Sequence, residues 1–233
     1  MNAVITGASR GIGRAVAEIF ALHGYNLLLC SKTEHTLLQT IEELKTAYPA
    51  VSIDGKALDL SNKTEAQLLG EWVLNNADTV DVLVNNTGTF IQGNVSDEPD
   101  GALDTMLGVN LFSAYHTTRA VLPKMKAQKS GHIFTICSIA SLGAYPGGGA
   151  YGISKYALLG FTRNLRAELK EHGIKVTAVI PGAVYTDSWK GSGVAESRIM
   201  EAEDLAKMML AATQLSPQAV VEDIVIRPQL GDL

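Results

Sequence analysis

The chain has 233 residues, of which 46% are hydrophobic and 18% are charged, and its formal net charge at pH 7 is −5. This length suffices for one sizeable core, so we expect one domain over residues 1–233, and the acidic balance argues against nucleic acid as a partner. No apolar run reaches the roughly 18 residues of a membrane span, which argues against a membrane partner, and strand-like sequence from Asn2 leaves no room for a signal peptide. We therefore expect a cytoplasmic protein.

Short β-branched runs alternate with amphipathic stretches along the whole chain. In chain order the strand-like runs are NAVIT, NLLLC, VSIDGKALDL, DVLVNN, HIFTICS, KVTAVIPG and VVEDIVIRP. Helix-like stretches follow them at 13–24, 35–48, 65–77, 101–127, 151–172 and 203–214. Strands separated by helices of this length form right-handed βαβ units. The sequence therefore predicts the α/β class: a doubly wound parallel sheet (Rossmann fold) of about seven strands with helices on both faces.

Cysteine and histidine give no sign of a cross-link or a metal. The two cysteines, Cys30 and Cys137, each end a strand-like run, and thiols at such positions are more often buried apolar groups than a disulfide. The five histidines lack the spacing of metal ligands. We expect no metal site.

The stretch TGASRGIG, from Thr6 to Gly13, lies between the first strand-like run and the first helix-like stretch. Gly7, Gly11 and Gly13 permit a tight turn and a close approach of a pyrophosphate to the free N–H groups at a helix N-terminus. The alternative is an ordinary turn that needs glycine only for a positive φ. Because a strand precedes the turn and a helix follows it, the pattern favours a dinucleotide.

The second strand-like run indicates which dinucleotide binds. An NAD site usually has Asp or Glu about 20 residues beyond the glycines, where it bonds the ribose 2′-OH. Here the run NLLLC continues into Ser31 and Lys32. With Arg10 from the glycine turn, these side chains would hold a 2′-phosphate by charge-assisted hydrogen bonds. The prediction is NADPH, although Lys32 and Arg10 taken singly could each be a solvated surface residue.

The segment YGISK indicates acid–base chemistry. Tyr151 and Lys155 are four residues apart, which places them on one face of a helix. A cation beside a phenol stabilises the phenolate, so Tyr151 could donate a proton to a carbonyl oxygen or accept one in reverse. Ser138 ends HIFTICS at the sheet edge where ligands bind and could polarise the substrate oxygen. Ser141 is a competing hydroxyl nearby.

The spacing TGxxxGxG, together with these later motifs, resembles the short-chain dehydrogenase/reductase family over nearly the whole chain. NNTG, Asn85 to Gly88, resembles its NNAG with Thr87 in place of alanine, and Asp59 with Leu60 resembles its adenine contact. The resemblance implies four catalytic residues, with Asn110 bonding through water to Lys155: Asn110, Ser138, Tyr151 and Lys155. The expected cofactor-binding residues are Gly7, Ser9, Arg10, Gly11, Ile12, Gly13, Ser31, Lys32, Asp59, Leu60, Asn86, Gly88, Tyr151, Lys155, Pro181, Gly182, Val184 and Thr186.

The substrate is the least determined part of the prediction. Loops expected above the nicotinamide carry an apolar and aromatic set that suits a planar or hydrophobic carbonyl compound, or that simply packs the loop: Phe90, Leu142, Tyr145, Tyr185 and Trp189. The segments from Pro181 and from Val220 resemble bacterial sepiapterin reductase-like members of the family. This resemblance implies a pterin stacked on Trp189, with Asp187 or Asp232 as a possible anchor. The irregular stretch 183–197 is expected to close over the nicotinamide.

Three functions remain open. The first is an NADPH-dependent carbonyl reductase with Tyr151 as general acid. The second is an NAD(P)-dependent alcohol dehydrogenase or a 3-ketoacyl thioester reductase, and the third is a non-catalytic dinucleotide-sensing protein. The resemblance also implies a homodimer or homotetramer that pairs through the helices after the fourth and fifth strands. Apolar residues of the latter helix give a weak hint of this: Leu158, Leu159, Phe161, Thr162 and Leu165.

Overall fold

The structure is a computed structural model that describes residues 1–186, 189 and 193–233. Its strands form one parallel sheet in the order β3-β2-β1-β4-β5-β6-β7. Their bounds are β1 (Asn2–Thr6), β2 (Asn26–Ser31), β3 (Ile53–Ala57), β4 (Val82–Asn85), β5 (Gly131–Ile136), β6 (Ile174–Pro181) and β7 (Asp223–Ile226). The predicted doubly wound sheet is confirmed.

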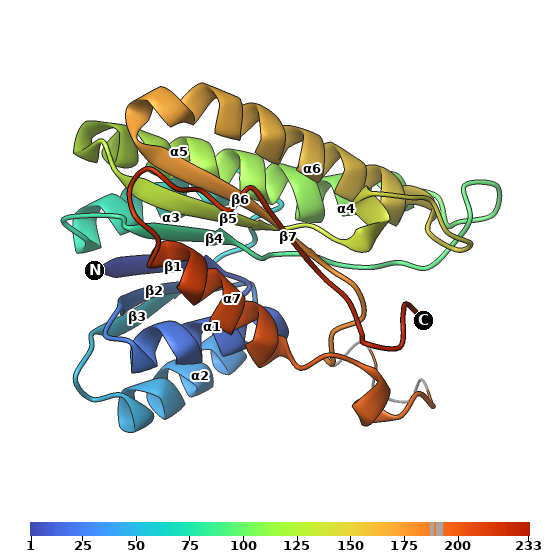
Figure 1. Ribbon diagram of the computed structural model, residues 1–233, viewed down its shortest axis with the longest axis horizontal. Helices are drawn as coiled ribbons and strands as arrows, with labels where there is room; N and C mark the ends of the chain where they lie inside the picture. Colours follow the sequence, from blue (N-terminus) through green and yellow to red (C-terminus); the bar gives the residue numbers. More distant parts are fainter. Residues whose placement is uncertain (187–188, 190–192) are drawn as a thin grey trace.

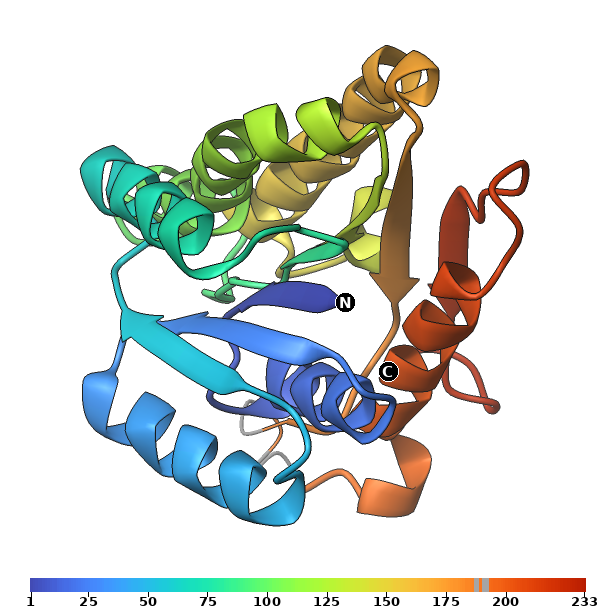
Figure 2. The same ribbon diagram turned by 90° about the vertical axis from the view of Figure 1, so that its left-hand side faces the viewer.

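Helices cover both faces of this sheet (Figures 1 and 2). One layer consists of α1 (Gly11–Leu22), α2 (Glu34–Ala47) and α7 (Ala202–Thr213). The other consists of α3 (Lys63–Asn76), α5 (Ser113–Gln128) and α6 (Gly149–Leu169), with the short α4 (Ala102–Met106) packed against α6. In the part of the chain that the structure describes, no helix is both long and apolar enough to cross a membrane.

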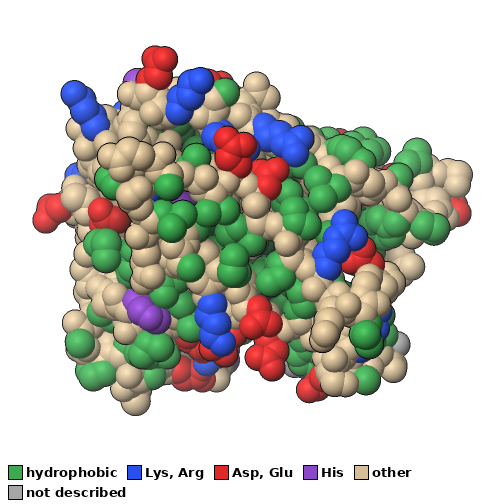
Figure 3. All heavy atoms as spheres, in the orientation of Figure 1, with side chains coloured by type: hydrophobic (Ala, Val, Ile, Leu, Met, Phe, Trp, Pro, Cys, Tyr) green, Lys and Arg blue, Asp and Glu red, His purple; other side chains and the backbone are tan. Residues whose placement is uncertain are grey.

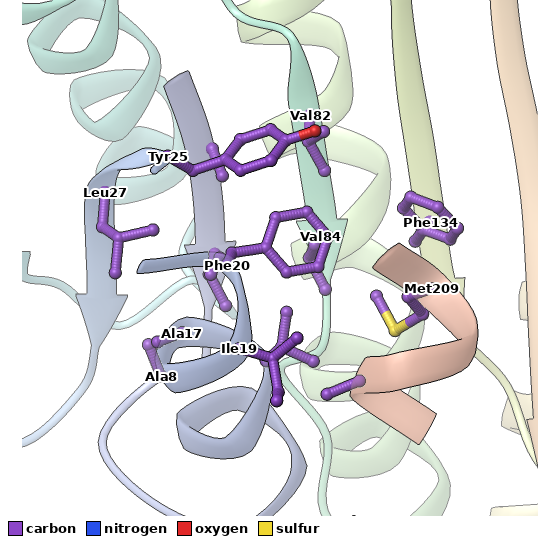
Figure 4. Packing of buried hydrophobic residues seen from close by; sticks show 14 of the residues in the cluster. Ala8, Ala17, Ile19, Phe20, Tyr25, Leu27, Val82, Val84, Phe134 and Met209 are labelled. Atoms are coloured by element: carbon purple, nitrogen blue, oxygen red, sulfur yellow. The ribbon is translucent and has the colours of Figure 1, made fainter. Parts of the chain in front are cut away.

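A hydrophobic cluster fixes α1 and α7 on the sheet. Phe20 of α1 is fully buried, and its ring lies 4.9 Å from that of Tyr25. Figure 4 shows Phe20 beside Val84 of β4, with Met209 of α7 approaching from the other side. Burial of one such side chain contributes about 1.5–3 kcal/mol, so the cluster helps to hold α1 and α7 against the sheet.

The two cysteines are buried and free, as predicted. Burial raises the pKa of Cys30 to about 12 and that of Cys137 to about 11. Both therefore remain neutral thiols that pack as small apolar groups.

The stretch predicted as one helix over 101–127 is divided into three parts. A π-helical segment, Leu107–Phe112, separates α4 from α5. Its wider turn places one buried polar side chain, Asn110, toward the interior of the protein. Single π-helical turns occur mostly as insertions at functional sites, and hydrophobic periodicity does not reveal them.

Four of the five residues in the sequence hint for a helical interface do not support it, and the fifth, Phe161, is partly buried. Leu158, Leu159, Thr162 and Leu165 are at most 6% exposed because they pack inside the monomer. The exposed apolar side chains of α6 are instead Ile153 and Tyr156, on the opposite face of the helix.

Candidate active site

The β1–α1 turn lies where the strand order reverses, between β1 and β4. Gly7 and Gly11 have φ values of +63° and +55°, which disfavour other residues. Gly13 is needed for a different reason, since an added Cβ would collide with the Gly7 carbonyl oxygen and with Asn86 Nδ2. The N-cap residue of α1, Arg10, makes no side-chain capping hydrogen bond. The turn therefore leads into a helix N-terminus whose N–H groups are not capped by Arg10, which suits a pyrophosphate.

Asn86 closes this turn from β4. Its Nδ2 donates to the carbonyl oxygens of Thr6 and Gly7, both at 3.0 Å. Thr6 Oγ1 accepts from the N–H groups of Asn86 and Thr87 at 3.0 and 3.1 Å, and it donates to Val84 O. The predicted cofactor residue Asn86 thus shapes the cradle through its side chain.

Hydroxyl and charged groups gather beside the turn where β2 ends. Ser9 Oγ and Ser31 Oγ are 2.8 Å apart. Lys32 Nζ is 2.7 Å from Asp59 Oδ2, and this hydrogen bond lowers the pKa of Asp59 while it raises that of Lys32. The Lys32 side chain is 77% exposed, so its ion pair is weak and solvent-screened. Arg10 is exposed in the same turn, and Leu60 is buried in a hydrophobic cluster with Val4 and Leu28.

Tyr151 and Lys155 lie one turn apart on α6, as the sequence predicts. Lys155 is buried, its Nζ donates to Ile136 O at 2.8 Å, and it lies 5.8 Å from the centre of the Tyr151 ring. Tyr151 is half-buried. Burial and the hydrogen bond to a strand carbonyl thus hold the cation beside the Tyr151 ring.

The first turn of α6 is held by a distant carboxylate. Its N-cap residue, Gly148, has no side chain, and Glu98 Oε2 accepts from Ala150 N at 2.9 Å instead. Negative charge at a helix N-terminus contributes about 0.3–1 kcal/mol. The loop that carries Glu98 therefore fixes the start of the helix immediately before Tyr151.

Ser138 follows β5 and starts a short 3-10 turn, Ile139–Ser141. Its Oγ accepts from Ala140 N at 3.1 Å and retains its own hydrogen for another acceptor. Ser141, the competing hydroxyl, is 1% exposed and accepts from Ser138 N. The arrangement leaves Ser138 as the hydroxyl suited to a substrate oxygen.

Asn110 is fully buried and uses its whole amide. Oδ1 accepts from Thr89 N at 2.7 Å, and Nδ2 donates to Thr89 O at 3.1 Å and to Ser154 Oγ at 2.8 Å. Gly88 lies between Asn110 and Lys155, because a Cβ there would be 3.4 Å from Asn110 Oδ1 and 3.7 Å from Lys155 Nζ. The four predicted catalytic residues therefore belong to one region at the carboxyl edge of the sheet.

The segment after β6 reaches back to the glycine turn. An added Cβ at Gly11 would lie 3.1 Å from Thr186 Cγ2. Pro181 and Val184 are buried, and Val184 pairs with Met200 in an isolated bridge. Gly182 faces the chain end, where a Cβ would be 3.0 Å from Asp232 Oδ1.

The structure brings some of the predicted substrate residues to the site. Phe90 meets Tyr151 edge to face at 4.9 Å, and Tyr145, whose pKa rises to about 12 through burial, is also near Tyr151. Leu142 is exposed on the same loop as Tyr145. Tyr185 donates its hydroxyl to Glu196 at 2.6 Å.

The remaining predicted substrate contacts lie on the less regular segments. Trp189 is half-buried, and its backbone N–H donates to Thr186 O at 3.0 Å. Asp232 pairs with Arg227 through Oδ2. Asp187 and part of the stretch expected to close over the site, 187–188 and 190–192, lie outside the described residues.

Sequence reasoning missed Thr89, Ser154 and Glu98. Ser154 is adjacent to Lys155 in YGISK, so the motif could have drawn attention to it. Thr89 and Glu98 act through a backbone contact and a cap across 52 residues, which no local pattern reveals.

Comparisons with known proteins agree with this geometry. The model of the short chain dehydrogenase family matches residues 1–196. Sepiapterin reductase of Chlorobaculum tepidum is 32% identical over 238 residues, which cover 99% of this chain and 97% of that protein. The solved structure of an alcohol dehydrogenase from Thermococcus sibiricus, complexed with 5-hydroxy-NADP, has a TM-score of 0.90 at 28% identity and covers 98% of this chain and 96% of its own.

A second solved structure is similar to this chain over nearly its whole length. L-Sorbose reductase from Gluconobacter frateurii, complexed with NADPH and L-sorbose, has a TM-score of 0.89 at 25% identity over 97% of this chain and 94% of that chain. The glycine turn, the Tyr151–Lys155 pair and these likenesses lead to one conclusion: the chain belongs to the short chain dehydrogenase family.

Proposed function

We propose that the protein is an NADPH-dependent reductase that converts a ketone to an alcohol. The observation that carries the proposal is the set of Ser138, Tyr151 and Lys155 at the carboxyl edge of the sheet, beside the glycine turn. A non-catalytic dinucleotide sensor would not need a buried lysine next to a half-exposed phenol. Oxidation of an alcohol and reduction of a ketoacyl thioester are the second candidate functions, because the same side chains serve both directions of the reaction.

Each catalytic side chain has a separate role in this proposal. NADPH, when bound, supplies the hydride. Tyr151 donates the proton to the carbonyl oxygen as negative charge develops there, and Lys155 stabilises the phenolate that remains. The free hydrogen of Ser138 Oγ stabilises the same oxygen, in the manner of an oxyanion donor. Asn110 keeps the surrounding segments in place.

The preference for NADPH rests on the groups at the end of β2. Ser31, Ser9 and Lys32 offer donors to a 2′-phosphate, and β2 ends without the carboxylate that a free ribose requires. The solved neighbours named above hold NADPH or 5-hydroxy-NADP. In this proposal Lys32 leaves or shares its ion pair with Asp59 when the phosphate binds.

Lys32→Ala should raise the Kd for NADP+ about tenfold because one charge-assisted hydrogen bond is lost, while the Kd for NAD+ changes less than about twofold. Titration calorimetry with both cofactors measures this. Lys45→Ala, in the last turn of α2, is the matched control. Equal losses for NAD+ and NADP+ would show that Lys32 does not recognise the phosphate.

The substrate in this proposal is a planar or hydrophobic carbonyl compound, such as a pterin with a side-chain ketone. Support comes from Phe90 and Tyr145 beside Tyr151 and from the likeness to a sepiapterin reductase. Asp232 Oδ2 pairs with Arg227, and this proposal places the selectivity mainly in the apolar contact surface.

NADPH oxidation should be measured against ketones, diketones, quinones, ketoacyl thioesters and pterins, with Tyr151→Phe as the paired variant. We expect turnover with planar ketones, a loss of about 1,000-fold in kcat in Tyr151→Phe, and an unchanged Kd for NADPH. Near-normal kcat in Tyr151→Phe would contradict the acid–base role. Absence of turnover across all substrates, with tight NADPH binding, would favour the sensor.

We also propose that the protein is a homodimer or homotetramer, as the family resemblance implies. Exposed apolar side chains on α5 and α6 support it, including Tyr115 (38%), Ile153 (46%) and Tyr156 (47%). Ile153 and Tyr156 line a shallow cleft of about 490 Å³ on the outer face of α6. Figure 3 also shows hydrophobic side chains over β7 and on the right-hand lobe near the start of α6.

Location in the cytoplasm stays a prediction from the sequence.

Light scattering at micromolar concentration should give two or four times the 24.8 kDa of one chain. Tyr156→Glu should lower that mass because it places a charge in the contact. The mass of a single chain in the parent protein would contradict the proposal.

A further inference from the structure

We propose that Ser154 is a positioning residue for the reduction: its hydroxyl ties Asn110 to α6 and so fixes Tyr151 and Lys155 relative to β4. The inference rests on the proposed role of Tyr151 as the proton donor. Ser154 is not one of the four predicted catalytic residues, and it lies directly before Lys155 in YGISK.

The hydrogen bonds of Ser154 determine which group donates. Its side chain is fully buried, and Oγ donates to Tyr151 O at 2.8 Å. A hydroxyl has one hydrogen, so the second contact, at 2.8 Å to Asn110 Nδ2, must be one that Oγ accepts. The amide nitrogen of Asn110 therefore faces α6, which also agrees with Oδ1 accepting from Thr89 N.

This chain of bonds connects three segments that are distant in sequence. Thr89 follows β4, Asn110 lies in the π-helical segment, and Ser154 lies on α6. Both hydrogens of Asn110 Nδ2 are used, one by Thr89 O and one by Ser154 Oγ. Asn110 thus acts by holding positions, and Ser154 is its contact with the helix that carries Tyr151.

Removal of the hydroxyl has a defined consequence. In Ser154→Ala one hydrogen of Asn110 Nδ2 is left in a buried place without its acceptor, which favours a displacement of the Asn110 side chain. The amide also holds both backbone groups of Thr89, next to Gly88, and a Cβ at Gly88 would lie 3.7 Å from Lys155 Nζ. A displaced Asn110 side chain therefore moves the segment of Gly88 and Thr89 that lies beside Lys155.

Thr162 is a suitable control on the same helix. It is also fully buried, and its Oγ1 donates to Leu158 O at 2.8 Å, as Ser154 Oγ donates to a helix carbonyl. It lies two turns beyond Ser154 and makes no hydrogen bond to Asn110 within the described part of the chain. Thr162→Ala therefore deletes an equivalent buried hydroxyl without touching the Asn110 contact.

The experiment is a double-mutant cycle between Ser154→Ala and Asn110→Ala in the full chain, assayed by NADPH oxidation with the best ketone. Ser154→Ala should lower kcat about tenfold with the KM for NADPH changed less than about twofold, whereas Thr162→Ala lowers Tm but leaves kcat within about twofold. In the Asn110→Ala background, Ser154→Ala should cause no further loss of kcat.

Two outcomes would overturn the inference: a kcat in Ser154→Ala equal to that of Thr162→Ala, or losses that multiply in the double variant. If Ser154→Ala does not fold, Ser154→Cys, whose thiol is a weak donor and acceptor, answers the same question through the same cycle. Tyr151→Phe distinguishes a failure of the proposed function from a failure of the role of Ser154. If it stays active, the proposed function fails; if it is inactive and the cycle is additive, only the role of Ser154 fails.

Discussion

Asn86 holds the carboxyl ends of β1 and β4 together, and the candidate active site is built around that contact. Its amide donates to the carbonyl oxygens of Thr6 and Gly7, and the space beneath is so small that Gly13 cannot carry a side chain. Because β1 and β4 are neighbours at the point where the sheet order reverses, this contact lies where open α/β sheets bind ligands. The contacts that shape the dinucleotide cradle are thus packing contacts of the fold itself.

The reacting groups are attached to this frame by long-range hydrogen bonds. Residues after β4 hold Asn110 through Thr89, and Asn110 holds α6 through Ser154. Lys155 is bound to the last residue of β5, and Glu98 caps the start of α6 from a loop. Tyr151 stands between these anchors, with Phe90 against the ring. Rigidity of the helix relative to two strands is what allows one phenol to meet a substrate oxygen in a fixed place.

The sequence was sufficient for the parts of the molecule that depend on local pattern. The βα alternation predicted the parallel sheet, and the glycine spacing predicted the turn between β1 and α1. Spacing of four residues correctly placed Tyr151 and Lys155 on one face of a helix. Buried thiols at Cys30 and Cys137 followed from strand ends.

The remainder depends on contacts between distant residues. The π-helical turn at Asn110 arises within a stretch whose periodicity reads as a single helix. The ion pair of Lys32 with Asp59 joins the segments that follow two strands. The sequence does not predict it, because each residue was expected to contact the cofactor separately. The apolar face of α6 was misjudged because Leu158 and Leu165 find partners on the sheet and on other helices.

The most direct test of a preformed cradle is a crystal structure of the protein with NADP+ bound. The account predicts that the Asn86 bonds to Thr6 and Gly7 are unchanged, with the pyrophosphate at the first turn of α1 and the 2′-phosphate within hydrogen-bonding distance of Lys32 or Ser31. A turn between β1 and α1 that rearranges to admit the cofactor, or a 2′-phosphate held away from these residues, would contradict it.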